Sequence, residues 1–240
     1  MAKENELKNT MVNNNVYVLT TINPETTNEL IAQLSCWVDK IPLQKLIPCS
    51  KPTDGEISDD EIRIIGNSSA KIYSPYEITP NNQPILNVYI NSNGGKTAVM
   101  QSILTLFNIA SAKGTIIKTY NLATASSSAS MIAISGTRGY RFMSENAYNY
   151  IHFGHFSGDT THTDEIEFMT KDLKNFDKTT RYIYLQNTKL TEKELNKYYN
   201  TEGAGRLYAK QCLQKGLCDW VITTDGRFVN NVRDLKSNQR

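Results

Sequence analysis

Hydrophobic residues follow two spacings along this chain, one typical of strands and one typical of helices. Short runs of β-branched and aromatic residues predict strands at 16–19, 85–90, 115–120, 139–143, 147–152 and 220–222. Apolar residues at helical spacing predict one helix after the turn at 91–95 and others at 131–135, 164–187, 192–199 and 209–215. Because strands alternate with helices, the pattern favours an α/β fold with a largely parallel sheet and right-handed crossovers.

A further helix, ahead of these, carries its own start and stop signals. Asn23 can cap it, and Pro24 stands where a missing N–H costs nothing. Pro42 ends it. The apolar residues at helical spacing in between are Leu30, Leu34, Trp37 and Val38. In the helix after 91–95, the residues expected on the inner side are Met100, Ile103, Leu104, Phe107 and Ile109.

Three segments fall outside this pattern. Residues 1–15 are polar and rich in asparagine, and we expect a flexible N-terminal tail there. Residues 229–240 are expected to form a polar C-terminal tail. Residues 42–82 hold most of the prolines and predict an insertion with a β-hairpin around Gly66-Asn67, an irregular surface loop being the alternative for the rest. We expect one domain over 16–228 that contains this insertion.

Composition narrows the functional classes. The chain has 240 residues and a net charge of +2, so it lacks the charge excess that binding to nucleic acid or an anionic membrane would need. Its polar N-terminus has no signal-peptide core, and no apolar run is long enough to span a bilayer. The four cysteines lack the spacing of a zinc or redox site, which indicates a reducing compartment: Cys36, Cys49, Cys212 and Cys218. We expect a cytoplasmic protein.

A stretch of small residues, 123–130, joins the predicted strand 115–120 to the apolar helix 131–135. A serine in such a turn can act as a nucleophile, because the free N–H groups at the start of a helix stabilise a developing oxyanion. The alternative is structural, with Ser126–Ser128 capping the helix and Ser130 packing against its neighbour. The local sequence alone favours the structural interpretation.

Two other features add to this candidate site. The turn at Gly94-Gly95 follows a strand, and its N–H groups can face a ligand, although Asn-Gly-Gly is also an ordinary tight turn. His152 ends a predicted strand, at the edge where sheet enzymes place their chemistry. His155 and His162 lie in the next loop, but no cysteine or acidic residue stands at a metal-ligand spacing. We therefore expect neither a metal nor a cofactor.

These features occur together, and in order, in a stretch that resembles the Clp-protease (ClpP) family of serine peptidases. The family's YINSPGG turn has a counterpart in residues 89–95, with Asn93 in place of the proline. The segments that resemble the family's first strand and helix, nucleophile turn, following strand, histidine segment and closing motif are 16–40, 125–131, 138–143, 144–152 and 215–219. The resemblance implies a ClpP/crotonase-type fold of stacked β-β-α units, with the helix 164–187 as a projecting handle.

Family spacing selects among the serines. His152 lies 25 positions after Ser127, which is the family's interval from nucleophile to histidine. The resemblance therefore implies Ser127 as nucleophile and His152 as base. It also implies the backbone N–H groups of Gly95 and Ser128 as oxyanion donors. Ser130 is the alternative nucleophile, but a serine one turn into a helix tends to bond a backbone carbonyl.

The third triad position departs from the family. Spacing before Gly216-Leu217 places the orienting acid at residue 200, which is an asparagine here. Asn200 can hold the histidine tautomer but cannot stabilise the imidazolium by charge, and such a change costs roughly 10⁴ in turnover in the serine-protease template. Glu202 is an alternative orienting group. The resemblance thus implies a serine endopeptidase that is weak or activated by a partner.

The resemblance also implies partners. It points to a ring-shaped homo-oligomer, such as a tetradecamer of two stacked heptamers, that cleaves peptides or unfolded proteins inside a chamber. An AAA+ unfoldase is the family's other partner, but no axial-pore segment resembling the family's precedes Val16, which argues against docking. The insertion at 42–82 could line or occlude the pore.

Two alternatives stay open at this point. Asn93 and Asn200 motivate a ring subunit that has lost turnover and serves a structural or regulatory role. A crotonase-type acyl-CoA enzyme would also use backbone oxyanion donors, but it would not need the pair of Ser127 and His152.

Overall fold

The structure of the chain is a computed structural model. It describes residues 8–41, 83–152, 163–201 and 203–235. The hairpin predicted within 42–82 lies outside these residues, as do His155, His162 and Glu202.

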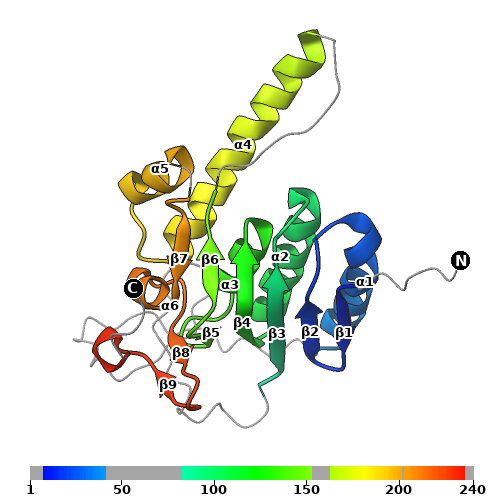
Figure 1. The fold of residues 1–240 in the computed structure, drawn as a ribbon. Coiled ribbons are helices and arrows are strands. Elements are labelled where there is room, and N and C mark those ends of the chain that lie inside the picture. Colours follow the sequence, from blue (N-terminus) through cyan, green and yellow to red (C-terminus); the bar gives the residue numbers. More distant parts are fainter. Residues whose placement is uncertain (1–7, 42–82, 153–162, 202, 236–240) are drawn as a thin grey trace, which may run out of the picture.

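Within the described residues, nine strands form one sheet (Figure 1). Its central strands are parallel, which confirms the predicted α/β class, and they lie in the order β2 (Asn15–Val18), β3 (Ile85–Ser92), β4 (Ile116–Ser126), β5 (Arg141–Ser144) and β8 (Trp220–Ile222). Two antiparallel strands complete the edges, β1 (Thr10–Val12) beside β2 and β9 (Phe228–Val229) beside β8.

The long strand β4 carries two neighbours on the same side. Its first part pairs with β5, at Thr119 to Asn121, and its last part pairs in parallel with β6 (Tyr148–Tyr150). A further strand, β7 (Arg206–Tyr208), pairs antiparallel with β6. As a result, the strand that leads to His152 lies beside the end of β4, where the chain turns into the next helix.

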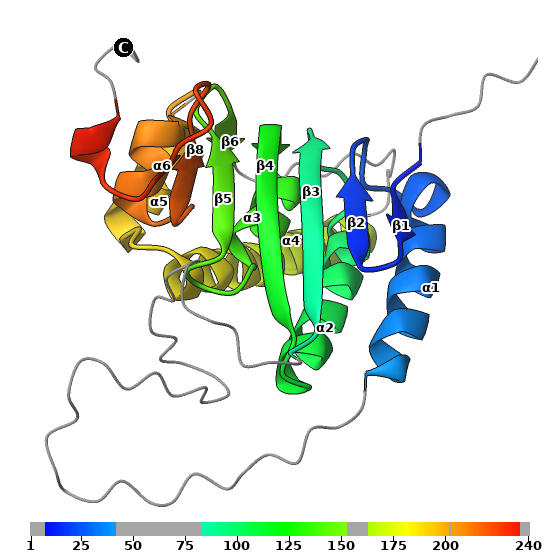
Figure 2. The same ribbon diagram turned by 90° about the horizontal axis from the view of Figure 1, so that it is seen from below.

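Helices cover one face of the sheet (Figure 2). They include α1 (Pro24–Lys40), α2 (Thr97–Ala112) and α3 (Ser128–Ile134). Residues that alternate along the strands, such as Val16, Val88 and Ile90, are fully buried beneath them. On the other face of the sheet, aromatic rings of neighbouring strands stack with centroids 4.8–5.4 Å apart. These rings belong to Tyr17, Tyr89, Tyr120 and Phe142.

The predicted long helix is confirmed as α4 (Thr163–Asn187), which projects away from the sheet (Figure 1). Its C-terminal part packs on α3 and on α5 (Glu192–Asn200). The last helix, α6 (Ala209–Lys215), has the predicted bounds and ends at Gly216 in the left-handed conformation. No helix among the described residues is both long enough and apolar enough to cross a membrane.

The predicted start of α1 is confirmed in atomic detail. The side chain of Asn23 accepts a hydrogen bond from the Thr26 N–H at 2.8 Å, and Pro24 is the first helical residue. The helix ends at Lys40, ahead of Pro42. Its buried apolar residues are Leu30, Leu34 and Val38, and Trp37 packs partly buried beside them.

Three predictions about individual segments are wrong. Ile109 is 42% exposed rather than on the inner side of α2, because it lies two positions from the buried Phe107, and the next inward position is Ala110. The described part of the expected N-terminal tail belongs to the fold, because Asn9 is fully buried and β1 forms a hairpin with β2. At the other end, Val229 is buried in β9 and Leu235 packs against the core, so the described part of the C-terminal tail belongs to the fold.

Candidate active site

The turn between β4 and α3 holds Ser127 in a strained backbone conformation. Its φ of 55° and ψ of −124° lie in a region that side-chain-bearing residues rarely adopt. In the described part of the chain, the only other non-glycine residue with a positive φ is Asn13, in the hairpin of β1 and β2. A serine on a sharp strand-to-helix turn exposes its hydroxyl at the edge of the sheet. This geometry is compatible with the predicted nucleophile turn.

Backbone hydrogen bonds from the next strand hold this turn. The N–H of Ser127 donates to the carbonyl oxygen of Tyr150 at 2.9 Å, and the Ser127 carbonyl accepts the N–H of Ser130 at 2.9 Å. The parallel register of β4 and β6 sets Ser126 opposite Tyr150. Because both strands end here, Ser127 and the segment that carries His152 leave the sheet side by side.

The four neighbouring serines have different surroundings. Ser126, Ser128 and Ser130 are buried, whereas Ser127 is partly exposed and its side chain does not cap α3. The Ser128 hydroxyl donates to the carbonyl oxygen of Gly95 at 2.8 Å. Of the four, Ser127 is thus the one that is not buried, which favours it over Ser130 as the candidate nucleophile.

Ser130 was expected to bond a backbone carbonyl, and this expectation is wrong. Its hydroxyl donates to Oδ1 of Asn149 in β6 and lies 2.7 Å from the hydroxyl of Tyr184 in α4. These side-chain partners are available because α3, β6 and α4 meet around this fully buried residue. Ser130 is therefore a core residue of the site's framework.

The glycine turn after β3 lies against the serine turn. An ideal Cβ on Gly94 would lie 2.5 Å from the Ser126 carbonyl oxygen and 2.8 Å from the Ser127 Cβ. Gly94 also has a φ of 91°, so any larger residue would be both strained and overlapped. The close approach of the two turns at this point depends on glycine.

Gly95 lies between Ile22 on one side and the serine turn on the other. Ile22 donates its N–H to the Gly94 carbonyl, and Lys96 donates its N–H to the Ile22 carbonyl, so these groups face Ile22. The Gly95 carbonyl accepts the Ser128 hydroxyl, so Gly95 contacts the serine turn on its other side. The role of the Gly95 and Ser128 N–H groups as oxyanion donors stays a prediction.

His152 follows β6 and is partly buried. Its ring stacks on that of Tyr150, with centroids 5.3 Å apart and planes at 24°. The guanidinium of Arg206, opposite Tyr150 in β7, lies 5.7 Å from the Tyr150 ring centroid. No group of three His, Cys, Asp or Glu side chains that could hold a metal ion is found in the portion of the chain that the structure describes.

Asn200 is the last residue of α5 and is exposed. Its side chain makes no hydrogen bond with any described residue, so its orienting role stays a prediction. The preceding residue, Tyr199, packs against the α4 residue Arg181, whose guanidinium lies 4.8 Å from the ring centroid. α5 is thereby attached to α4 next to the predicted position.

Of the three cysteines that the structure describes, two offer no reactive thiol. Cys212 and Cys218 are both buried. Burial raises the pKa of each thiol, and the neighbouring Cys218 contributes to the increase at Cys212. Both therefore stay protonated and unreactive at neutral pH.

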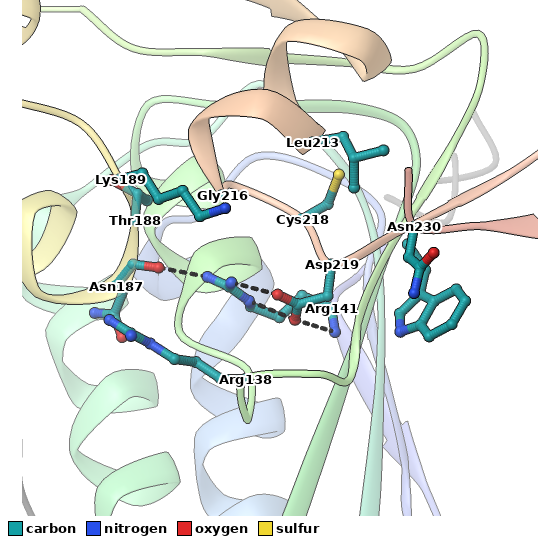
Figure 3. A pocket seen from close by; sticks show the side chains of 11 residues that line it. Arg138, Arg141, Asn187, Thr188, Lys189, Leu213, Gly216, Cys218, Asp219 and Asn230 are labelled. Atoms are coloured by element: carbon teal, nitrogen blue, oxygen red, sulfur yellow. Dashed lines mark hydrogen bonds and ion pairs between the residues drawn. The ribbon is translucent and has the colours of Figure 1, made fainter. Parts of the chain in front are cut away.

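A cavity of about 210 Å³ lies elsewhere, where α4 ends (Figure 3). Arg141 dominates it, forming a buried ion pair with Asp219 at 2.6 Å and donating to the Asn187 carbonyl at 2.5 Å. Arg141 pairs with Thr119, seven residues before Ser126 in β4. Since a strand rises about 3.3 Å per residue, the cavity is roughly 23 Å from the serine turn along the sheet. Arg141 anchors the C-terminus of α4 through its bond to Asn187, and the cavity is separate from the candidate site.

The site includes contacts that the sequence did not single out. Tyr150 had a local signal, because residues two apart in a strand share a face, and this spacing relates Tyr150 to His152. Asn149 and Tyr184 had none, since Tyr184 lies 54 positions from its partner Ser130.

Comparison with protein families agrees with this geometry. A family model described as Clp protease matches residues 76–225, which is more than half of the chain. The match contains the glycine turn, Ser127, His152 and Asn200, whereas β1, β2 and α1 lie before it. The class of protein that the fold and this match define is the Clp-protease (ClpP) type. The chain belongs to the Clp protease family.

Proposed function

We propose that this chain is a serine endopeptidase in which Ser127 is the nucleophile and His152 the base. The observation that carries the proposal is the strained conformation of Ser127, at a φ of 55°, between the Tyr150 carbonyl and Gly94. Strain of this kind is retained where the exposed position of a side chain is needed. No cofactor enters the reaction.

The reaction proceeds by acyl transfer. The Ser127 hydroxyl attacks the carbonyl carbon of a peptide bond while His152 takes its proton, and the N–H groups of Gly95 and Ser128 hold the oxyanion. His152 then gives the proton to the leaving amine as the C–N bond breaks. A water molecule, deprotonated by His152, cleaves the resulting ester and restores the serine.

Because residue 200 is an asparagine, we expect a low kcat for this reaction. In the proposed triad Asn200 accepts from the His152 Nδ1–H and fixes the tautomer, but it supplies no negative charge to the imidazolium. The same residue supports the alternative function, a ring subunit with little or no turnover and a structural or regulatory role.

The proposed setting is an oligomeric ring, with α4 as the handle and peptides or unfolded proteins as substrates in an enclosed chamber. The proposal takes a tetradecamer as the expected size and the cytoplasm as the expected location. Docking of an AAA+ unfoldase is not part of the proposal, and neither nucleic acid nor membrane takes part.

Hydrolysis of fluorogenic peptides by the purified, assembled protein tests the proposal. Wild type and Ser135→Ala should cleave at similar rates, because the Ser135 hydroxyl only bonds the Met131 carbonyl of its own helix. Ser127→Ala should lose the activity by at least about 10³-fold. Absence of hydrolysis in the wild-type assembly would favour the inactive subunit instead.

A further inference from the structure

Three buried polar side chains form a hydrogen-bonded chain beneath the serine turn. They are Tyr184 in α4, Ser130 in α3 and Asn149 in β6, and each is at most 2% exposed. The Ser130 hydroxyl donates its single proton to Asn149 Oδ1, so in the 2.7 Å contact with Tyr184 the phenol must be the donor. Burial raises the pKa of Tyr184, which keeps the phenol protonated and able to donate.

Two members of this hydrogen-bonded chain, Ser130 and Asn149, are close to proposed site residues. Ser130 lies three positions after Ser127 and donates its backbone N–H to the Ser127 carbonyl at 2.9 Å. Asn149 lies three positions before His152, and the next residue, Tyr150, accepts the Ser127 N–H. The side-chain network thus joins the same two segments whose relative placement sets the distance between nucleophile and base.

α4 also supports the third proposed element. Arg181, one helical turn before Tyr184, donates to Asn196 Oδ1 at 2.7 Å and to Glu192 Oε2 at 3.1 Å, both on α5. Asn200 ends that helix. One short part of α4 therefore contacts the serine helix and the helix of Asn200 directly, and it is linked to the histidine strand through Ser130.

We propose that Tyr184 is a positioning residue for the site: its hydroxyl donates to Ser130 and so fixes the orientation of the Ser130 hydroxyl, whose bond to Asn149 holds α3 against β6 and keeps Ser127 and His152 aligned. This proposal rests on the proposed peptidase function. A buried polar chain adds little to stability over an apolar packing of the same volume, but fully satisfied it fixes one arrangement of the elements it joins. Catalysis depends on such placement, since a misplacement of 1 Å can cost roughly 10²-fold in rate.

The test compares Tyr184→Phe with Tyr182→Phe in the assembled protein. The control removes the same hydroxyl from a side chain of α4 that is 65% exposed. For a fluorogenic peptide, kcat of Tyr184→Phe should fall roughly 10- to 100-fold with KM within about twofold, while Tyr182→Phe matches wild type. If Tyr184→Phe instead lowers Tm or the assembled fraction, and the protein that remains assembled keeps the wild-type kcat, the hydroxyl serves packing and the positioning role is wrong.

A second variant covers the case in which Tyr184→Phe does not assemble. Ser130→Ala breaks the same chain at its centre and should show the same fall in kcat, and the double variant should lose no more than the larger single loss, because the hydroxyls act through one network. If wild type is active and both single variants keep its kcat, the positioning role is wrong and the peptidase function stands. If wild type itself is inactive on peptides, the proposed function fails and the positioning role fails with it.

Discussion

The backbone N–H of Ser127 donates to the carbonyl oxygen of Tyr150 at 2.9 Å, across the ends of two parallel strands. This bond joins the turn that carries the proposed nucleophile to the strand that ends two residues before His152. On its other side, the same turn meets Gly94 too closely for any Cβ. The strained serine is thus held between two neighbours.

Gly94→Ala should impair the site more than an ordinary positive-φ glycine substitution. The new methyl group would meet the Ser126 carbonyl at 2.5 Å and the Ser127 Cβ at 2.8 Å, and we expect peptidase activity to fall at least about 10²-fold. The control is Gly226→Ala, which shares a positive φ, 82°, but has no heavy atom within 4 Å of the new methyl. It should keep activity within about twofold of wild type. Equal activity of the two variants would show that the glycine turn does not shape the site.

Asn200→Asp should increase turnover if residue 200 orients the base. A carboxylate at this position would stabilise the His152 imidazolium, and the serine-protease template gives a range of up to roughly 10⁴ for this exchange. Steady-state kcat on a fluorogenic peptide measures it, with Asn196→Asp on the same helix as the control for added charge. An unchanged or lower kcat would place the orienting group elsewhere.

The order of the elements could be predicted from the sequence because its signals are local. The cap at Asn23 and the bounds of α6 depend on residues within a few positions, and both are as expected. Ile109 is apolar, and this alone predicts an inward position. It lies only two positions after the inward Phe107, however, whereas the helical spacing of three or four brings Ala110 inward instead. β1 was missed because three residues of a short hairpin carry almost no pattern.

The site could be predicted only in part, for a related reason. Ser127 was selected by its interval to His152, but its positive φ arises from contacts with Gly94 and Tyr150, which are distant in sequence. The side chains of Asn149 and Tyr184 carry no motif. Their roles follow from the packing of three elements around Ser130, which no local pattern encodes.

Arg141→Met should destabilise the fold strongly, although it lies far from the proposed chemistry. The substitution leaves Asp219 buried and unpaired, and removal of one partner of such a pair costs about 3–5 kcal/mol in the free energy of unfolding. Denaturant unfolding measures this, with the exposed Arg233→Met as control. The double variant Arg141→Met/Asp219→Leu should regain only part of the loss, because it removes the unpaired carboxylate but leaves the backbone N–H groups of Gly139 and residue 141 without this acceptor. A single variant as stable as the control would contradict the anchoring role at the end of α4.

Glu194 should contribute a pH-dependent part of the stability. The hydrogen bond from Lys215, with a smaller contribution from the Thr191 N–H, lowers the pKa of this carboxyl in the folded state. Its stabilising effect is therefore complete above the unfolded pKa of about 4.3 and is lost as the pH falls through the lower folded value.

The substitution that tests this is Glu194→Gln. At pH 7 it should lower Tm by roughly 1–4 °C, and the difference from wild type should shrink below about pH 4. Glu167→Gln, an exposed change on α4, should alter Tm little at either pH. A Tm difference that is the same at pH 7 and pH 3.5 would show that the ionised form of Glu194 is not the stabilising one.

Covalent labelling with a fluorophosphonate probe tests the central claim most directly, because the probe needs a serine that is activated as a nucleophile. After labelling of the assembled protein and proteolytic digestion, mass spectrometry identifies the modified residue. We predict a single phosphonylated serine, Ser127, and no adduct in Ser127→Ala or in His152→Ala over the same time. An adduct at Ser130, or no adduct in wild type, would contradict the account.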